Sequence, residues 1–135
     1  MQYWLVKSEP GAYSWERFKK EGKTVWDGVR NYQARNNLKE MKKGNLVLFY
    51  HSNEGMAVQG IAKVSREFFQ DPGTDDARWV SVELSYYQEL KHPVSLQQMK
   101  ADSILENIGL IRQSRLSVMP LKVEEFDRII SLGMG

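Results

Sequence analysis

The 135-residue sequence contains no cysteine. Without it the chain has no disulfide, no thiolate nucleophile and no thiolate metal site, a composition that suits a reducing cytosol. Histidine is also scarce, since only His51 and His92 occur and they lie far apart in the chain. A metal site needs three or four ligands at recognisable spacing. The sequence therefore predicts no metal and no bound cofactor.

Long hydrophobic runs are absent as well, because no apolar stretch approaches the ~18 residues that a membrane span requires. Residues 1–7 lack the basic-then-apolar order of a signal peptide and predict the first strand of the fold instead. The length falls within the usual size of one domain. We expect a single soluble domain, residues 1–135, without a membrane partner, located in the cytoplasm or, in a eukaryote, the nucleus.

A strong excess of one charge is missing too, since the formal net charge is only +2. Nonspecific attraction to a nucleic-acid backbone should then be weak. Residues 1–60 nevertheless carry ten Lys and Arg against six Asp and Glu, which would make one side of the protein basic. The alternative is that these lysines are ordinary solvated helix faces.

The first part of the chain alternates strands and short helices. Residues 2–7 predict a strand, and Ser14 can cap a short helix that Gly22 ends. After an extended piece at 24–26, residues 31–41 predict a second helix, with Ala34, Leu38 and Met41 as its buried stripe.

The middle of the chain predicts three consecutive antiparallel strands. Residues 46–50 form a continuous apolar run, and a turn at 53–55 leads into a return strand over 56–69. A polar loop over 70–76 precedes residues 79–86, which alternate apolar and polar side chains as a half-buried strand does.

The last part predicts mainly helix. Ser95-Leu96-Gln97-Gln98 is a capping box, and residues 123–133 show the apolar spacing of a final helix. Between them, residues 115–118 predict a short strand that Pro120 closes. The fold class expected is α+β, with a curled, barrel-like sheet, because many short strands close their edges most easily that way.

Signals for catalysis are weak. His51-Ser52 could be half of a dyad, but no third orienting group can be named beside it, and no nucleophile elbow is present. Residues 55–60 copy the first half of a phosphate-binding loop, but Ile61-Ala62 stands where Lys and Ser or Thr are needed. These glycines instead suit a hairpin turn and close packing in the return strand.

Residues 26–37 hold the densest polar and aromatic stretch. It combines rings that stack, amides that pair with base edges and guanidinium groups that bind phosphate, namely Trp26 and Tyr32, Asn31 and Gln33, and Arg30 and Arg35. These groups suit a base-sized pocket, and an aromatic wall tolerates an added methyl group. In the alternative interpretation, Trp26 and Tyr32 are simply core aromatics.

A second polar cluster, residues 112–118, places two arginines and two serines around the predicted short strand. Leu116 and Val118 would pack inward, while Arg115 and Ser117 would project to the other face. Both clusters could line one cleft.

Five motifs in order resemble the EVE domain family, and they span nearly the whole chain: residues 3–10, 13–15, 26–36, 49–52 and 112–118. The resemblance implies a PUA-like fold, a small β-barrel with flanking short helices, related to the YTH domains that bind methylated adenine. It also implies a non-enzymatic partner of nucleic acid that recognises a modified base in DNA or RNA.

Carried onto this chain, the resemblance and the clusters name two sets of residues. The expected base pocket consists of Lys7, Ser8, Trp26, Val29, Asn31, Tyr32, His51, Ser52, Ser114, Leu116 and Ser117. The candidates for phosphate contact are Arg30, Arg35, Arg112 and Arg115. Residues 67–76 are the variable part, which could alter the accepted sequence context.

Two other functions compete with this one. The same pocket could process a nucleotide or a small metabolite, with His51 as acid or base. It could also belong to a small protein-interaction module that binds a cellular small molecule. Loss of turnover in His51→Ala would identify the enzyme, and a steep salt dependence would identify a phosphate-contacting binder.

Overall fold

The computed structural model describes all residues, 1–135, as one mixed sheet with five helices. The strands are β1 Tyr3–Ser8, β2 Lys23–Trp26, β3 Leu46–His51, β4 Ala57–Gln70, β5 Val80–Ser95 and β6 Val118–Leu121. The helices are α1 Trp15–Glu21, α2 Tyr32–Glu40, α3 Leu96–Lys100, α4 Gly109–Arg112 and α5 Val123–Met134. The α+β class predicted from the sequence is confirmed.

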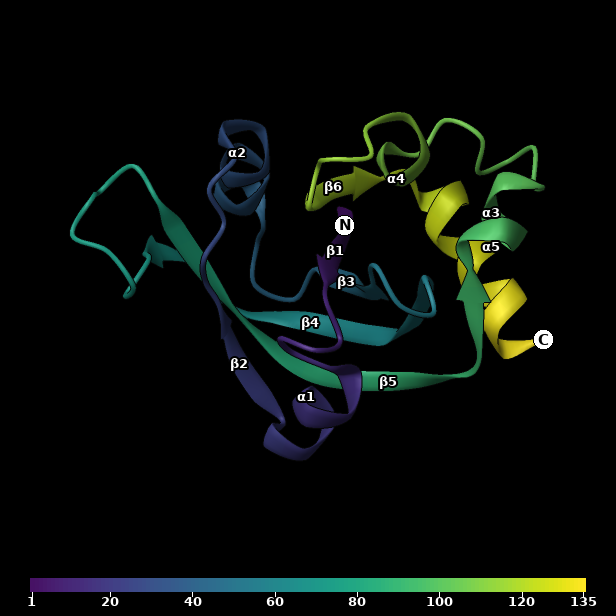
Figure 1. The fold of residues 1–135 in the computed structure, drawn as a ribbon, viewed down its shortest axis with the longest axis horizontal. Helices are drawn as coiled ribbons and strands as arrows, with labels where there is room; N and C mark the ends of the chain where they lie inside the picture. Colours follow the sequence, from purple (N-terminus) through teal and green to yellow (C-terminus); the bar gives the residue numbers. More distant parts are fainter.

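The six strands follow the order β2-β5-β4-β3-β1-β6. β3, β4 and β5 are antiparallel neighbours, as predicted, whereas β1 lies parallel to β3 and antiparallel to β6. The long strands β4 and β5 curve through the molecule in Figure 1. Because β2 and β6 are the outer strands and do not pair with each other, the sheet is open and a closed barrel is not confirmed.

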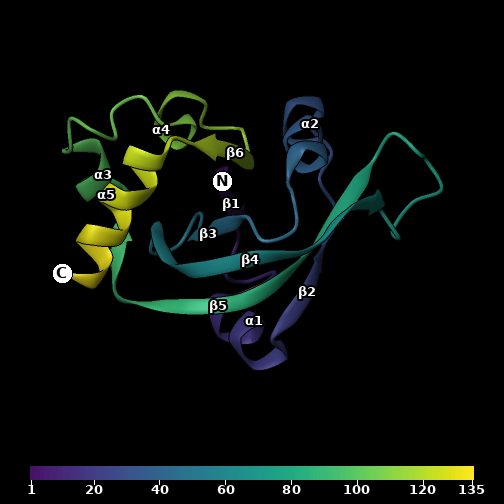
Figure 2. The same cartoon turned by 180° about the vertical axis from the view of Figure 1, so that it is seen from behind.

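The helices lie around this sheet at different places. α1 follows β1 and packs beside β2, while α2 contacts β6 and β5. α5 lies against β5, and Figures 1 and 2 show it together with α3 and α4 on the side of the molecule away from β2. No helix is both long and apolar enough to cross a membrane.

The core contains a cluster of aromatic side chains beside Gly60 of β4. Trp15 of α1 meets Phe49 of β3 edge to face with ring centroids 5.2 Å apart, and Phe18 of α1 stacks on the same ring at 5.5 Å. Gly60 lies directly under Trp15, and a Cβ there would overlap the indole ring. The glycine that the sequence associates with close packing therefore makes room for the tryptophan.

The predicted helix signals are found where the sequence places them. The Ser14 side chain accepts from Arg17 N, and Gly22 ends α1 in the left-handed region with φ +77. The predicted Ser95–Gln98 capping box begins α3, and α2 starts with an N-cap at Asn31 that was not predicted from the sequence. Ala34, Leu38 and Met41 are all fully buried, as the spacing of the second helix predicts.

The strand predicted over 115–118 is wrong. Residues 113–116 form a turn, in which Leu116 N donates to Gln113 O at 3.0 Å, and the strand begins only at Val118. Pro120 does not close it but lies within β6, opposite Trp4 of β1. Proline is tolerated there because β6 is an edge strand, so the missing N–H removes no bond to a further strand.

The strand predicted over 79–86 is also too short, since β5 continues to Ser95. Its register against β4 shifts at several points, between Val58 and Gly60 and between Ile61 and Ala62 among others. Such bulges interrupt the alternation of inward and outward side chains, and the period-two signal ends although the strand does not.

Candidate functional site

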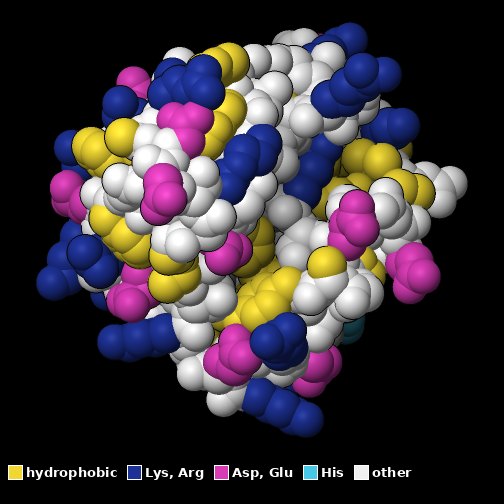
Figure 3. Space-filling model, turned by 60° about the vertical axis from the view of Figure 1, so that its left-hand side comes forward, with side chains coloured by type: hydrophobic (Ala, Val, Ile, Leu, Met, Phe, Trp, Pro, Cys, Tyr) yellow, Lys and Arg dark blue, Asp and Glu magenta, His cyan; other side chains and the backbone are white.

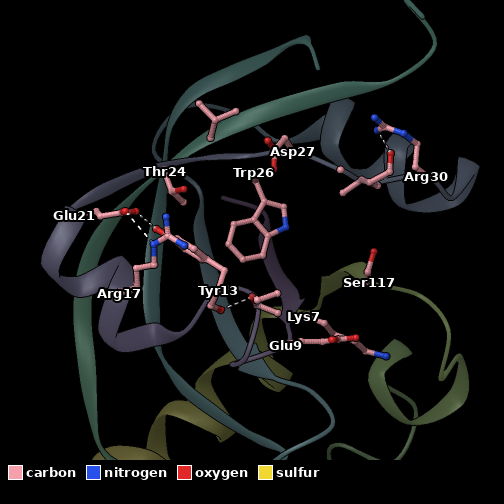
Figure 4. A pocket seen from close by; sticks show the side chains of 15 residues that line it. Lys7, Glu9, Tyr13, Arg17, Glu21, Thr24, Trp26, Asp27, Arg30 and Ser117 are labelled. Carbon is pink, nitrogen blue, oxygen red and sulfur yellow. Dashed lines mark hydrogen bonds and ion pairs between the residues drawn. The ribbon is translucent and has the colours of Figure 1, made fainter. Parts of the chain in front are cut away.

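A cavity of about 680 Å³ opens between β1, α1, β2 and the turn before β6. The face in Figure 3 is hollowed, with hydrophobic side chains at the bottom and charged side chains of both signs around them. The cavity is lined by Lys7, Ser8, Glu9, Ala12, Tyr13, Arg17, Glu21, Thr24, Val25, Trp26, Asp27, Gly28, Val29, Arg30 and Ser117. Figure 4 shows the lining side chains from close by, with ten of them labelled.

Trp26 forms the aromatic wall. Its indole ring projects into the centre of the view in Figure 4, yet the residue is only 8% exposed. It meets Phe49 edge to face at 5.5 Å and Tyr13 edge to face at 6.2 Å. Trp26 therefore belongs both to the core and to the cavity, which combines the two interpretations that the sequence leaves open.

Tyr13 is held in place by a polar pair on α1. Its hydroxyl donates to Glu21 Oε1 at 2.6 Å, and Arg17 Nε donates to the other carboxylate oxygen at 3.2 Å. Burial together with the hydrogen bond to Glu21 raises the pKa of Tyr13 to about 12. The bond from Tyr13 also lowers the pKa of Glu21. At neutral pH the phenol is thus a fixed donor and the carboxyl group is ionised.

Lys7 joins β1 to the turn before β6. Its Nζ donates to Ser114 O at 2.7 Å, and its backbone N–H donates to Ser117 O at 2.9 Å. Burial lowers the pKa of Lys7. Two motifs from opposite ends of the chain therefore form one wall of the cavity.

The opposite wall is anchored by the loop between β4 and β5. Asp71 is 1% exposed, and one of its carboxylate oxygens accepts from Gly28 N and from Arg30 Nη1, both at 2.8 Å. Burial alone would raise the pKa of Asp71, but the hydrogen bonds from Arg30, Gly28 and Gly73 outweigh it and lower the pKa. The arginine is therefore engaged in holding the wall together.

Of the residues named from the sequence, the cavity brings together six: Lys7, Ser8, Trp26, Val29, Arg30 and Ser117. Asn31 lies just outside, where its Oδ1 caps α2 by accepting from Ala34 N at 2.9 Å. Tyr32 is 53% exposed and packs against Trp79 in a tilted arrangement with ring centroids 5.1 Å apart. Arg35 lies over the Tyr32 ring at 5.1 Å. These three side chains lie on the outside of the cavity wall.

His51 and Ser52 lie behind the wall, at the end of β3. The His51 Nε2 accepts from Trp15 N at 2.9 Å, and burial lowers the pKa of His51. Ser52 N donates to Ser8 O at 2.9 Å and so fixes the end of β1. Neither side chain lines the cavity.

The remaining residues named from the sequence lie along the turn before β6. Ser114 contributes its carbonyl oxygen to Lys7, and Arg115 is exposed. Arg112 and Leu116 line a second, separate cavity on the other side of this turn. The turn therefore divides the predicted cluster between two cavities.

Sequence reasoning did not name several lining residues, among them Glu9, Tyr13, Arg17, Glu21 and Asp27. Tyr13 falls within the family motif at residues 13–15, which by itself indicates no role for the phenol. Arg17 and Glu21 have the spacing of a surface ion pair on a helix, which carries no signal for a pocket. Only the turn after β1 brings them beside Trp26.

The cavity has the groups needed to hold a flat heterocycle. Trp26, Tyr13 and Val29 supply apolar and aromatic surface, while the Glu9 and Asp27 carboxylates make no hydrogen bond within the protein. Lys7 keeps free N–H donors beside them, and the Ser8 hydroxyl, which donates to Tyr13 O, is left as an acceptor. A planar ligand with exocyclic amino and carbonyl groups would find surface for its face and partners for its edge.

Comparison with known proteins decides the family, because the EVE domain profile matches residues 2–132. This chain belongs to the EVE domain family. The EVE domain is 34% identical to human thymocyte nuclear protein 1, in an alignment covering 96% of this chain and 73% of that protein. It superimposes on a protein of Agrobacterium tumefaciens with TM-score 0.97 and 43% identity, covering 98% and 93% of the two chains.

Two further solved structures share the fold of this EVE domain. Human thymocyte nuclear protein 1, crystallised in complex with DNA containing 5-methylcytosine, matches with TM-score 0.92 and 33% identity over 100% of this chain and 99% of that one. A YTH domain from Zygosaccharomyces rouxii matches with TM-score 0.64 at 15% identity over 99% and 87%, which is a likeness of fold alone.

Proposed function

We propose that this EVE domain binds a nucleic-acid strand through a modified base, which it holds in the cavity beside Trp26 without changing it chemically. The observation that carries the proposal is the likeness over the whole chain to the human protein that was crystallised with 5-methylcytosine DNA. Nucleic acid carrying a modified base is then the partner of this domain, and neither a metal nor a cofactor takes part.

The chemistry of the cavity supports a base as its occupant. A carboxylate such as Glu9 or Asp27 can accept from an exocyclic amino group, which is the contact that acidic side chains make with cytosine. The rings of Trp26 and Tyr13 offer apolar surface to a methyl group. Of the residues named from the sequence, we assign base contacts to Lys7, Ser8, Trp26, Val29 and Ser117, and we add Glu9, Tyr13 and Asp27 to them.

The other predicted residues receive supporting roles in this proposal. Asn31, His51, Ser52 and Ser114 hold the wall through the hydrogen bonds described above. Arg35 and Arg115 contact phosphates beside the cavity, with Tyr32 under Arg35. Arg30 serves mainly to bind Asp71, because its guanidinium is already paired there.

The geometry does not favour the alternative in which His51 acts as acid or base. Its Nε2 is occupied by the Trp15 N–H, and no carboxylate bonds to its other ring nitrogen. A general base must reach the proton it abstracts, and His51 lies behind the cavity wall. We therefore propose a binding domain and not an enzyme.

The test is a binding screen by fluorescence anisotropy on matched DNA and RNA strands of one sequence, with cytosine or 5-methylcytosine at the centre. The expected result is tighter binding to one modified strand, and competition by the same modified nucleoside added free. Equal affinity for all strands, over a panel of other modified bases as well, would exclude recognition of a modified base.

A further inference from the structure

A second cavity of about 430 Å³ lies between α2, α4, β6 and the start of α5. Its floor is apolar and formed by Ile108, Leu116, Met119 and Leu121, all of which are buried. It takes no part in the site described above. The turn before β6 separates the two cavities, because Leu116 lines one and its neighbour Ser117 lines the other.

Amide side chains surround this floor, and they fall into two groups. Gln2 and Asn37 use their amides to donate to the carbonyls of Leu121 and Val118, at 3.1 and 2.7 Å, and so hold β6 in place. Three others, Gln33, Asn107 and Gln113, line the cavity but make no side-chain hydrogen bond within the protein. Their donors and acceptors are available to a ligand.

The charges around the cavity are mainly positive. Arg112 and Lys122 stand against a single acid, Glu125, which is buried and accepts from Lys122 N at 2.8 Å. Arg112 makes no ion pair and no side-chain hydrogen bond within the protein. An arginine free of carboxylate partners suits a phosphate group.

We propose that this second cavity binds another unpaired nucleotide of the strand whose modified base occupies the first cavity. Its base lies on the apolar floor, its edge bonds to Asn107 and Gln113, and its phosphate contacts Arg112. Apolar contact for the face and amides for the edge are the usual means of holding an unstacked base.

We assign the occupants of the two cavities to one nucleic-acid strand because the cavities are adjacent. Lys7 ties the dividing turn to β1 through Ser114 O and Ser117 O, so the two cavities share a fixed wall. A nucleotide that leaves the first cavity across this turn arrives beside Arg112. The inference rests on the proposed function, since it assigns a second position on the same ligand.

The experiment is an abasic scan. Each single-stranded oligonucleotide carries the preferred modified base at its centre and one abasic site at a different flanking position. The affinity for each is measured by anisotropy for the wild type and for the double variant Asn107→Ala and Gln113→Ala. We expect one flanking position at which an abasic site lowers wild-type affinity about tenfold, a size typical of one well-paired base. In the variant this loss should disappear.

Arg112→Gln tests the phosphate contact, with Lys91→Gln as the control because Lys91 is exposed and lines neither cavity. Arg112→Gln should make the salt dependence shallower by about one unit, and the control should not. Preference for the modified base with no sensitive flanking position, or with equal sensitivity in wild type and variant, overturns the second site alone. If the wild type shows no preference for the modified strand over the unmodified strand, the proposed function itself is overturned.

Discussion

At the scale of single residues, Trp26 has two roles that an experiment can separate. Because it is 8% exposed and packs on Phe49, we expect Trp26→Ala to lower the free energy of unfolding by about 3–5 kcal/mol, as truncation of a buried aromatic does. Binding by the remaining folded protein should also fall, since stacking contributes about 1–3 kcal/mol per base. Urea denaturation and anisotropy measure the two effects.

Phe126→Ala is the matched control for Trp26. Phe126 is 6% exposed and stacks on Tyr3, but it lines neither cavity. It should lose comparable stability while the folded fraction keeps its affinity. If Trp26→Ala behaves in the same way, Trp26 is structural only and the base lies elsewhere.

The exposure of Arg115 predicts that it contributes to the salt dependence of nucleic-acid binding. Arg115 is exposed and makes no ion pair, so its guanidinium is available to a phosphate. Arg115→Gln should lower affinity for modified and unmodified strands by a similar factor and reduce the salt slope by about one unit. Stability should not change. Loss of discrimination between the two strands would mean instead that Arg115 contacts the base.

The burial and hydrogen bonding of His51 predict that the stability of the fold depends on pH. The His51 Nε2 accepts the Trp15 N–H, which requires that nitrogen to be unprotonated. Burial lowers the pKa of His51, with Glu16 acting in the opposite direction, so the pKa in the folded state lies below that of the unfolded chain. The contribution to stability is therefore present above pH ~6.5 and is lost as the pH falls from there towards the folded pKa.

The measurement is the urea midpoint of wild type and of His51→Gln at several pH values between about 5 and 8. The wild type should lose more stability on acidification than the variant, because other titrating groups are common to both. Parallel profiles for the two proteins would show that His51 does not titrate in this range.

At the scale of elements, β4 depends on Gly60 to admit α1. A Cβ at Gly60 would overlap Trp15 and come within 2.8 Å of Gln88 O. We expect Gly60→Ala to lower the free energy of unfolding by about 1–3 kcal/mol through overpacking. Gly11→Ala, where a Cβ meets nothing within 4 Å, should have little effect in the same urea titration. Equal stability of the two variants would show that α1 shifts without strain.

The elements also show how far local sequence signals reach. The caps at Ser14 and Ser95 were predicted because each depends on hydrogen bonds within three or four residues. β6 was misplaced because its position depends on pairing with β1, more than a hundred residues away. Local alternation of side chains contains no information about that partner.

At the scale of the whole molecule, the chain ends meet in one sheet. β1 pairs with β3 on one side and with β6 on the other, and α2 packs against β6. We propose that residues 1–135 unfold as a single cooperative unit. Urea unfolding followed by tryptophan fluorescence and by far-ultraviolet circular dichroism should then give coincident transitions. Two distinct midpoints would indicate separate units.

The sequence by itself determined the class of the fold, most helix ends and five of the six strands, apart from the far end of β5, because these follow from local hydrogen bonding and side-chain periodicity. Its motifs also pointed to the family that the EVE profile then matched. The absence of cysteine excluded thiolate chemistry without any structure. Each of these properties depends on residues close together in the chain.

Only the tertiary structure decided which polar side chains meet. Lys7 and Ser117 lie on one wall because the first strand crosses the turn before the last strand, and Tyr13 joins Trp26 because α1 folds back over β2. The same turn sends Arg112 into a second cavity. These contacts join residues distant in the sequence, and their positions follow from the packing of the whole core, which no local pattern encodes.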